Sequence, residues 1–339
     1  MRLIWLQIII YISLSTTLLA KDYRGHRDVK IFIDQMVKKY GYSRYKLNSL
    51  FSDIKYQKKA LAVYLPHLRP KRKYKKSKKR IGSWDRYKSI IVTKSKFPKG
   101  VEYLHKHRYT LQRAYRKYGI PPEYITAIIG IESHYGYNAG RYPVLDTLTT
   151  LAFEKNRRSR FFKSELRAFL LMTKRENIDP REVKGSYAGA IGLGQFMPSN
   201  YKLYVVDFNG DGKKRMNNTQ DAIGSIAYYL KRHGWKRDQP VATRVSYKGR
   251  RYNSKKTGYK YKYSRASLKG IKPKEEFDYR GKVHLIKLKR TEYDELWYGT
   301  KNFYVITRYN HSSYYAMGVH QLAQGIKMGY NKKYGDILR

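Results

Sequence analysis

The sequence predicts an α+β protein that is mainly α-helical and carries a small antiparallel β domain late in the chain. Before residue 239, apolar residues recur at helical spacing in several segments, and this spacing returns at 315–327. Between 241 and 298 they alternate with polar residues instead, and Gly-Lys and Asn-Ser pairs interrupt the alternation. Hydrophobic residues make up 41% of the 339 residues, which can build a real core and excludes wholesale disorder.

The expected elements follow from this patterning. Helices are expected within 21–66, across 84–117, from 121 to 133, twice within 145–173 and from 315 to 327. Strands are expected at ATRVSY (242–247) and KVHLIKLKR (282–290). We divide the chain into a signal peptide (1–20), an N-terminal helical domain with a basic loop at 69–80 (21–118), a catalytic core (119–238), a small β domain (239–300) and a C-terminal return to the core (301–339).

The N-terminus is typical of a secretory signal. Arg2 precedes a mostly apolar run over 3–20, although Leu18 stands where a small residue is preferred before the cleavage site. We expect cleavage after Ala20, and an uncleaved anchor is the alternative. Cysteine is absent, which excludes disulfides, thiolate metal sites, cysteine nucleophiles and a lipidated cysteine. We therefore expect an exported, periplasmic protein without a lipid anchor.

The charge balance is strongly basic. Lys and Arg number 73 against 25 Asp and Glu, a net charge of +48, and the densest basic run is RPKRKYKKSKKR at 69–80. Such a charge indicates a polyanionic partner, namely nucleic acid, anionic lipid or an acidic polymer. An AT-rich genome, which enriches Lys and Tyr at tolerant positions, is the alternative explanation, and the 36 Tyr against 11 Phe fit it. The signal peptide argues against nucleic acid.

One carboxyl group stands out, that of Glu132 in GIESHYG. Two prolines at 121–122 are typical of a helix start. Glu132 then shares the apolar stripe of this helix, at i, i+3, i+4 and i+7, with Ile125, Ile128 and Ile129. Burial and the negative end of the helix dipole, in the last turn before Gly136, both disfavour the anion. Glu132 is therefore expected to stay protonated near neutral pH, as a general acid requires.

A glycine-rich segment, KGSYAGAIGLGQFMPSNY at 184–201, offers neutral hydrogen-bonding groups at Ser186 and Gln195 and a flat apolar face at Phe196. This mixture suits a carbohydrate, and a glycine-rich packing turn explains it equally well. In the third segment, NFYVITRYNHSSYYAMGVHQLA at 302–323, Tyr309 and Tyr315 are candidates for lining a binding site, although ordinary core and surface residues would look the same. His134 is expected to be structural or substrate-facing, because the nine histidines are scattered.

The segment DFNGDG at 207–212 matches the first half of an EF-hand calcium loop. Asn218 stands where the twelfth-position Glu is expected, and Lys213, Lys214 and Arg215 crowd positive charge onto any cation. A turn rich in Asp and Asn is the alternative. Asp221 lies further on and could close a longer loop.

Together these segments are similar to one known family. GIPPEYITAIIGIESHYG, LDTLTTLAF, RRSRFF, KGSYAGAIGLGQFMPSNY, VDFNGDG, DAIGSIAYYLKRHGW and NFYVITRYNHSSYYAMGVHQLAQ resemble, in this order, the membrane-bound lytic transglycosylase B family. The similarity runs from about residue 84 to the C-terminus and weakens across the β segment. The missing cysteine makes this chain resemble a soluble, non-lipidated version.

The resemblance implies a lysozyme-like helical core with an additional α domain and a small β domain. It implies cleavage of the β-1,4 bond between N-acetylmuramic acid and N-acetylglucosamine in peptidoglycan, with 1,6-anhydro ends, by a monomer that needs no cofactor for the chemistry. Glu132 matches the catalytic acid and base. The matching sugar-binding positions are Ser186, Gln195, Phe196, Tyr229, Tyr309, Tyr315 and Tyr87. Arg157 and Arg158 match a pair that meets the peptide stem, and a structural calcium ion would be held by Asp207, Asn209, Asp211 and Asp221. Within that loop RMNNTQ replaces the family's usual aromatic and Asp-Pro stretch, which puts calcium in doubt.

Two other functions remain as alternatives. A hydrolytic muramidase would need a second carboxylate, for which Asp146 is the nearest candidate, although LDTLTTLAF favours a helix-capping role for it. A non-catalytic scaffold would bind peptidoglycan through the basic surface alone, without using Glu132.

Overall fold

A computed structural model of the chain describes residues 20–65, 81–249 and 251–336. All but the last residue of the predicted signal peptide, and the basic loop at 69–80, lie outside these ranges. Within the described ranges no helix is both long and apolar enough to span a bilayer.

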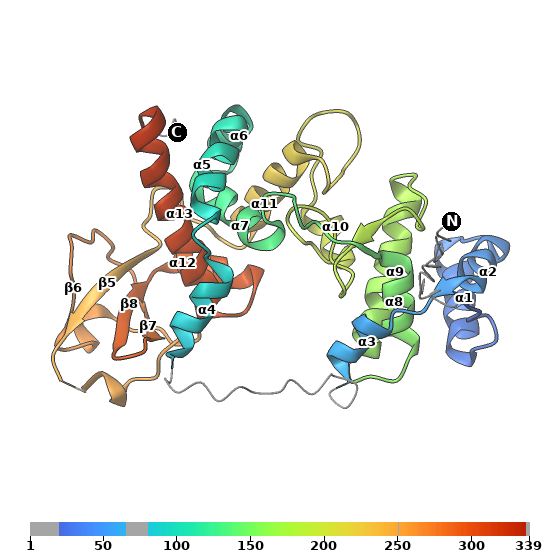
Figure 1. Cartoon of the computed structure of the whole chain (residues 1–339), viewed down its shortest axis with the longest axis horizontal. Helices are drawn as coiled ribbons and strands as arrows, with labels where there is room; N and C mark the ends of the chain where they lie inside the picture. Colours follow the sequence, from blue (N-terminus) through green and yellow to red (C-terminus); the bar gives the residue numbers. More distant parts are fainter. Residues whose placement is uncertain (1–19, 66–80, 250, 337–339) are drawn as a thin grey trace, which may run out of the picture.

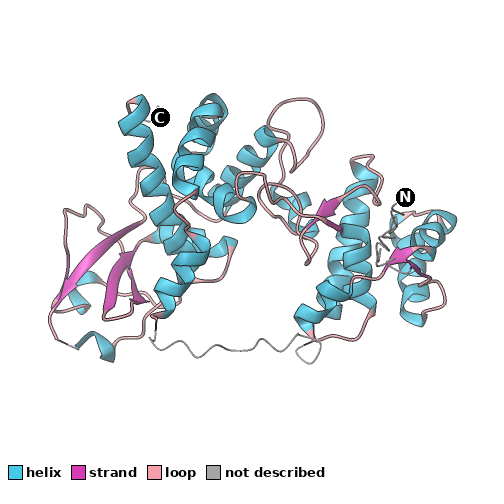
Figure 2. Ribbon diagram, in the orientation of Figure 1, coloured by secondary structure: helices cyan, strands magenta, loops and turns pink. Residues whose placement is uncertain are grey.

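Helices dominate the structure, and half of the strands form one small sheet (Figure 2). The helices are α1 (Arg27–Tyr40), α2 (Arg44–Ser52), α3 (Lys58–Tyr64), α4 (Ser83–Ile91), α5 (Lys96–Lys106), α6 (Arg108–Tyr118), α7 (Pro122–Ser133), α8 (Val144–Phe153), α9 (Ser159–Arg175), α10 (Pro198–Tyr204), α11 (Thr219–Arg232), α12 (Lys301–Tyr309) and α13 (Ser313–Tyr334). The strands are β1 (Ala20–Lys21), β2 (Ile54–Lys55), β3 (Tyr142–Pro143), β4 (Lys184–Gly185), β5 (Ala242–Tyr247), β6 (Ile271–Pro273), β7 (His284–Lys289) and β8 (Asp294–Gly299). The mainly helical α+β prediction is confirmed.

One helical group, at the end of the molecule that carries the described N-terminus, combines α1–α3 with α8 and α9 (Figure 1). Phe32 of α1 and Phe51 of α2 meet Phe153 at the end of α8, with ring centres 5.7 and 6.2 Å from that of Phe153. Tyr64 of α3 packs against Phe162 of α9 at 4.9 Å. Short amphipathic helices cannot bury their apolar faces alone, so this group depends on the two longer partners.

A second helical group surrounds α7, which packs against α5, α6, α11 and α13. The packing therefore differs from the predicted boundary at residues 118 and 119. α5 and α6, from the predicted N-terminal domain, pack with α7 and α11, and α4 packs on α13. α8 and α9, from the predicted catalytic core, pack with the N-terminal helices instead. Sequence patterning marks apolar faces but does not say which face another helix covers, so it cannot detect this exchange.

Four antiparallel strands form the small sheet, in the order β6-β5-β8-β7, and all four lie within 239–300. ATRVSY is β5, and KVHLIKLKR contains β7. Both faces of β7 are buried: Ile286 and Leu288 join the main core, while Leu285 joins a second cluster inside the β domain. The sheet is thus fixed to α4 and α12 through one of its faces.

The aromatic contact between α8 and the N-terminal helices gives a stability prediction. Replacing Phe153 by Ala removes the ring that Phe32 and Phe51 contact and should lower the free energy of unfolding by about 3–5 kcal/mol. Urea denaturation followed by circular dichroism measures this. Tyr45→Ala is the control, because Tyr45 is 83% exposed, and an equal loss in both variants would contradict the assignment.

Candidate active site

α7 passes through the second helical group and is buried on nearly every side. Residues 122–130 and Ser133 are buried, and only Ile131 and Glu132 are partly exposed. Pro121 is the N-cap residue and Pro122 begins the helix, where the missing N–H has no intrahelical partner to lose. The sequence predicts an apolar stripe on one side, whereas nearly the whole circumference of the helix is buried. Glu132 lies where this buried helix reaches the surface.

The end of α7 is fixed by its own continuation. His134 and Tyr135 have left-handed φ angles of 52° and 61°, so two non-glycine residues end the helix before Gly136. Tyr135 folds back over Gly130, where a Cβ atom would lie 2.6 Å from its ring, and its hydroxyl donates to the carbonyl of Lys96 at 2.6 Å. Each such backbone conformation costs about 1–3 kcal/mol, which this packing offsets. The position of Glu132 is thereby tied to α5.

Three tyrosines interact with the Glu132 carboxyl group. Tyr315 of α13 donates a hydrogen bond from its hydroxyl to Glu132 Oε1 at 2.6 Å. Tyr309, at the end of α12, lies nearly parallel to Tyr315, with the ring centres 6.3 Å apart. Burial and the charge of Glu132 raise the pKa of these two tyrosines and that of Tyr87 on α4. Each is therefore a neutral hydrogen-bond donor at neutral pH.

The electrostatics of Glu132 favour a general acid. Burial raises the pKa of Glu132 to about 7, although the hydrogen bond from Tyr315 and the charge of Lys96 act in the opposite direction. Lys96 is 7% exposed and donates from Nζ to the carbonyl of Ile91 at 2.8 Å. Burial lowers the pKa of Lys96, and the charge of Glu132 opposes this. Near neutral pH Glu132 can therefore both give and take a proton.

The glycine-rich segment at 184–201 contacts the tyrosines beside Glu132. Tyr309 donates from its hydroxyl to the carbonyl of Gly194 at 2.5 Å, and a Cβ atom at Gly194 would lie 2.9 Å from that hydroxyl. Phe196 is only 3% exposed and packs on Tyr229 and Tyr309, with ring centres 5.6 and 5.7 Å away. The hydroxyl of Tyr229 donates to the carbonyl of Arg308 at 2.6 Å. Phe196 and Tyr229 thus pack against Tyr309, and the contact of Phe196 with sugar stays a prediction.

Ser186 and Gln195 hold the segment in shape. Ser186 Oγ accepts hydrogen bonds from two loop N–H groups at 3.0 and 3.3 Å. The amide of Gln195 donates to the carbonyl of Ala139 at 2.8 Å, and Gln195 itself is left-handed with φ of 51°. Both side chains are partly exposed. Their contact with sugar stays a prediction.

Arg157 and Arg158 lie apart from Glu132, in the exposed turn between α8 and α9. Arg158 stacks over Phe161 at 4.2 Å. Burial and the neighbouring Tyr187 raise the pKa of Tyr64, whereas the two arginines oppose this. Tyr187 follows Ser186 directly. Tyr64 therefore lies close enough to both the arginine pair and the glycine-rich segment for their charges to affect its pKa.

The predicted calcium loop is closed by its own hydrogen bonds. Asp207 accepts from the N–H groups of Gly210 and Gly212 at 2.7 and 2.8 Å. Asp221 is fully buried in the first turn of α11 and accepts from the N–H groups of Phe208, Asn209 and Arg215 at 2.7, 3.2 and 2.8 Å. Asp221 thus ties both ends of the loop to α11.

The donor set of this loop fits a hard cation in its chemistry, because Asp207, Asn209, Asp211 and Asp221 offer only oxygen ligands. Their oxygens are turned toward the loop instead: Asp211 accepts from the N–H of Lys213 and from the side-chain amide of Asn209. In the described part of the chain no three acidic or histidine side chains are grouped as a metal site.

Asp146 does not have the capping role that the sequence suggests. Pro143 is the N-cap residue of α8 and has no side-chain cap, while Asp146 is buried in the first turn. Burial raises the pKa of Asp146 to about 6, and its neighbours are Lys55, Asp53 and Arg181. These belong to the N-terminal helical group, whereas Glu132 lies in the second group. Asp146 is therefore not placed to act with Glu132.

Sequence reasoning missed two residues of the site. Tyr314, beside Tyr315, packs on Tyr87 with the ring centres 5.7 Å apart, and its position next to a predicted site residue was the available signal. Lys96 could not be found among 73 basic residues, because its burial depends on how α4, α5 and α7 meet.

A helical core that presents one acid of raised pKa among tyrosines has the group that a glycosidic-bond-cleaving enzyme needs as its general acid. Residues 25–324 match the family model described as the transglycosylase SLT domain. The membrane-bound lytic murein transglycosylase B of Escherichia coli (strain K12) is 39% identical over 309 residues, which cover 91% of this chain and 84% of that protein. The chain belongs to the family of this lytic transglycosylase.

Solved structures agree with the family. The Escherichia coli lytic transglycosylase Slt35 in complex with bulgecin A has a TM-score of 0.83 and 38% identity, covering 92% of this chain and 96% of that one. The same values hold for Slt35 in complex with calcium. SltB3 from Pseudomonas aeruginosa in complex with NAG-NAM-pentapeptide has a TM-score of 0.76 and 25% identity, covering 91% and 80%. The lysozyme-like core with added α and β parts is thus confirmed.

The position of Lys96 predicts a change in pH dependence. Lys96→Met removes a positive charge that lowers the pKa of Glu132, so this pKa should rise and the alkaline limb of the activity profile should move to higher pH. Glycan cleavage rates measured across neutral pH test this. Lys99→Met is the matched control, since it removes the same charge from an exposed position on α5. Equal shifts in both variants would indicate a bulk charge effect and contradict the assignment.

Proposed function

We propose that the protein cleaves the β-1,4 bond between N-acetylmuramic acid and N-acetylglucosamine in peptidoglycan and leaves 1,6-anhydro ends. The observation that carries this proposal is Glu132, a single carboxyl group with a pKa of about 7 that is hydrogen-bonded to Tyr315. Membership of the lytic transglycosylase family supports it. One carboxyl group suffices because the substrate brings its own nucleophile, unlike the two-carboxylate scheme of ordinary glycosidases.

In the first step protonated Glu132 gives its proton to the glycosidic oxygen as the bond to C1 of the muramoyl residue breaks. The resulting carboxylate is stabilised by the hydroxyl of Tyr315 and by the positive charge of Lys96. In the second step the C6 hydroxyl of the same residue attacks C1 and passes its proton to Glu132. The acid is thereby restored, and a pKa near neutrality makes both transfers accessible.

The glycan would lie along the tyrosines and the glycine-rich segment. Tyr87 and Tyr309 are partly exposed beside Glu132, and Ser186 and Gln195 lie on the neighbouring loop. Arg157 and Arg158 would bind the carboxylates of the peptide stem. The complex of the Pseudomonas relative with NAG-NAM-pentapeptide, a ligand that carries such a peptide, supports this. Phe196 and Tyr229 would contribute indirectly, because their rings pack against Tyr309 and fix its position.

Hydrolysis and passive binding are less well supported. A hydrolase would need a second carboxylate near Glu132, and Asp146 lies in the other helical group. A scaffold would not need an acid of raised pKa. We further propose that the enzyme acts in the periplasm as a monomer without a lipid anchor, and that its net charge of +48 serves the carboxylate-bearing peptidoglycan rather than nucleic acid.

Calcium is proposed as a structural ligand of the loop at 207–221. Asp207, Asn209, Asp211 and Asp221 would hold it, and the calcium complex of the Escherichia coli relative supports this. The ion would reinforce a loop that Asp221 already closes and would take no part in the chemistry. Lys213, Lys214 and Arg215 would weaken its binding through charge repulsion.

The central test replaces Glu132 by Gln and analyses, by mass spectrometry, the fragments released from purified peptidoglycan. The native enzyme should release anhydro fragments, each lighter than the hydrolytic product by one water, and the variant should be slower by about a thousandfold. Glu102→Gln, an exposed acid on α5, should keep full activity. Fragments with reducing ends, or a rate within tenfold of the native one in Glu132→Gln, would overturn the proposal.

The calcium proposal is tested by thermal unfolding. Added calcium should raise the midpoint by about 2–4 °C, because it binds only the folded loop. Asp211→Asn should remove this rise, whereas Asp278→Asn, an exposed acid outside the loop, should retain it. No rise with the native protein would leave the segment as a turn closed by its own amide groups.

A further inference from the structure

The short helix α4 forms one side of the surroundings of Glu132. Trp84 is fully buried, and Tyr87 stacks on it with the ring centres 6.1 Å apart and the planes at 24°. Tyr314 meets Trp84 edge-on at 5.3 Å and accepts or donates a hydrogen bond with Ser83 Oγ at 2.8 Å. Tyr314 directly precedes Tyr315, whose hydroxyl donates to Glu132. A shift of α4 would therefore change the position of Tyr315 relative to the Glu132 carboxyl group.

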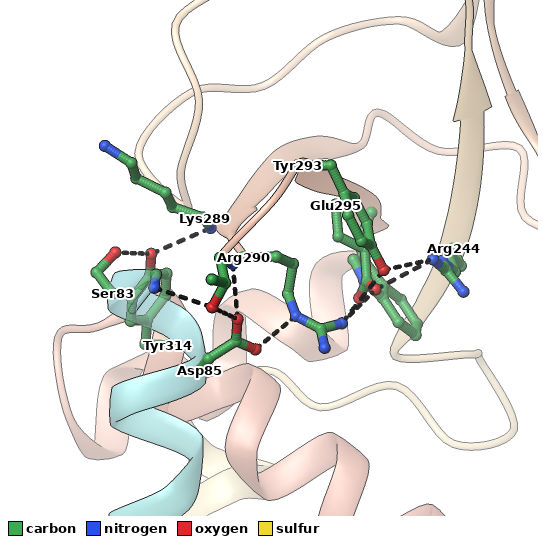
Figure 3. A network of polar contacts seen from close by, with 11 residues as sticks. Ser83, Asp85, Arg244, Lys289, Arg290, Tyr293, Glu295 and Tyr314 are labelled. Atoms are coloured by element: carbon green, nitrogen blue, oxygen red, sulfur yellow. Dashed lines mark hydrogen bonds and ion pairs between the residues drawn. The ribbon is translucent and has the colours of Figure 1, made fainter. Parts of the chain in front are cut away.

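The first turn of α4 rests on the turn between β7 and β8 (Figure 3). Asp85 Oδ1 accepts from Arg290 Nε at 2.6 Å, and Asp85 Oδ2 accepts from the N–H and the hydroxyl of Thr291 at 2.7 and 2.8 Å. Although burial alone would raise it, these hydrogen bonds hold the pKa of Asp85 below its usual range. A Cβ atom at Gly82 would lie 2.2 Å from the carbonyl carbon of Arg290, so only glycine allows this approach.

The other end of Arg290 is held inside the β domain. Arg290 Nη1 donates to Glu295 Oε2 at 3.0 Å, and Glu295 is 6% exposed. Glu295 also pairs with Arg244 of β5 at 3.2 Å and accepts from Trp297 Nε1 at 2.7 Å. Arg290 therefore joins an acid on α4 to an acid anchored in two strands, as Figure 3 shows. The chain has only 25 acidic residues, and two of them are used on this one guanidinium group.

We propose that Arg290 is a positioning residue for the cleavage reaction: through Asp85 it fixes α4 on the β domain and so keeps Tyr87 and Tyr314 packed beside Glu132. This inference rests on the proposed function, since it concerns the same acid. Without Arg290, Asp85 keeps only its hydrogen bonds from Thr291, so α4 is held less firmly on the β domain and water can reach the carboxyl group of Glu132. The Glu132 acid then becomes easier to ionise, and Tyr87 no longer presents a fixed face to the glycan.

The test compares Arg290→Met with Arg244→Met. Both variants remove one positive charge bonded to Glu295, and only the first breaks the contact with Asp85. Cleavage of a soluble uncross-linked glycan strand is measured across neutral pH. In Arg290→Met the alkaline limb should fall by about one pH unit and KM should rise about fivefold. Arg244→Met should change neither, and Arg290→Lys, which keeps the ion pair with Asp85, should recover part of both.

Unchanged pH limb and KM in Arg290→Met, with only a lower unfolding temperature, would overturn the proposal and leave Arg290 as a structural contact. Should Arg290→Met fail to fold, Asp85→Asn breaks the same ion pair while keeping the side chain's size, and the same shifts are expected. Failure of the proposed function is separate: it would show as activity in Glu132→Gln, whatever the behaviour of the arginine variants.

Discussion

The hydrogen bond from Tyr315 to Glu132 is the contact on which the site depends, because it joins residues 183 positions apart on two different helices. α7 brings the acid out of the core, and α13 brings the tyrosine that orients it and shields it from water. The tyrosine stabilises the carboxylate, while burial stabilises the neutral acid, and the balance leaves the pKa of Glu132 near neutrality. The neighbouring contacts, from Lys96 to Tyr309 and Gly194, limit how this pair can move.

The arrangement of the helices explains why that pair is rigid. α7 is buried among four other helices, and Tyr135 folds back over Gly130 to fix its end against α5. On the other side of Glu132, α4 is fixed to the β domain through Asp85 and Arg290. The small β sheet contributes no predicted catalytic group, but through Arg290 and Asp85 it contacts the helix that packs beside Glu132.

Much of this could be predicted from local sequence. The helix at 121–133, the strand ATRVSY and the raised pKa of Glu132 follow from residue spacing and turn residues, which the structure confirms. The packing of α8 and α9 with the N-terminal helices could not be predicted, since it depends on contacts between segments that are distant in the sequence. Nor does the sequence show that Tyr229 and Tyr309 cover Phe196, or that Lys96 is buried when many other lysines are exposed. Both outcomes depend on tertiary contacts that no local pattern encodes.

The order in which the chain is made has a consequence for the site. Tyr309 and Tyr315 stand near the end of the sequence, and the acid that they shield lies in its first half. A chain that ends at α11 would lack the tyrosines that cover Glu132, and the pKa of this carboxyl group would move toward its ordinary value. The proton needed for cleavage is thus retained only after α12 and α13 have docked. Docking of these two helices thus completes the fold and also raises the pKa of Glu132, so a truncated molecule would lack the bound proton with which to cut a glycan.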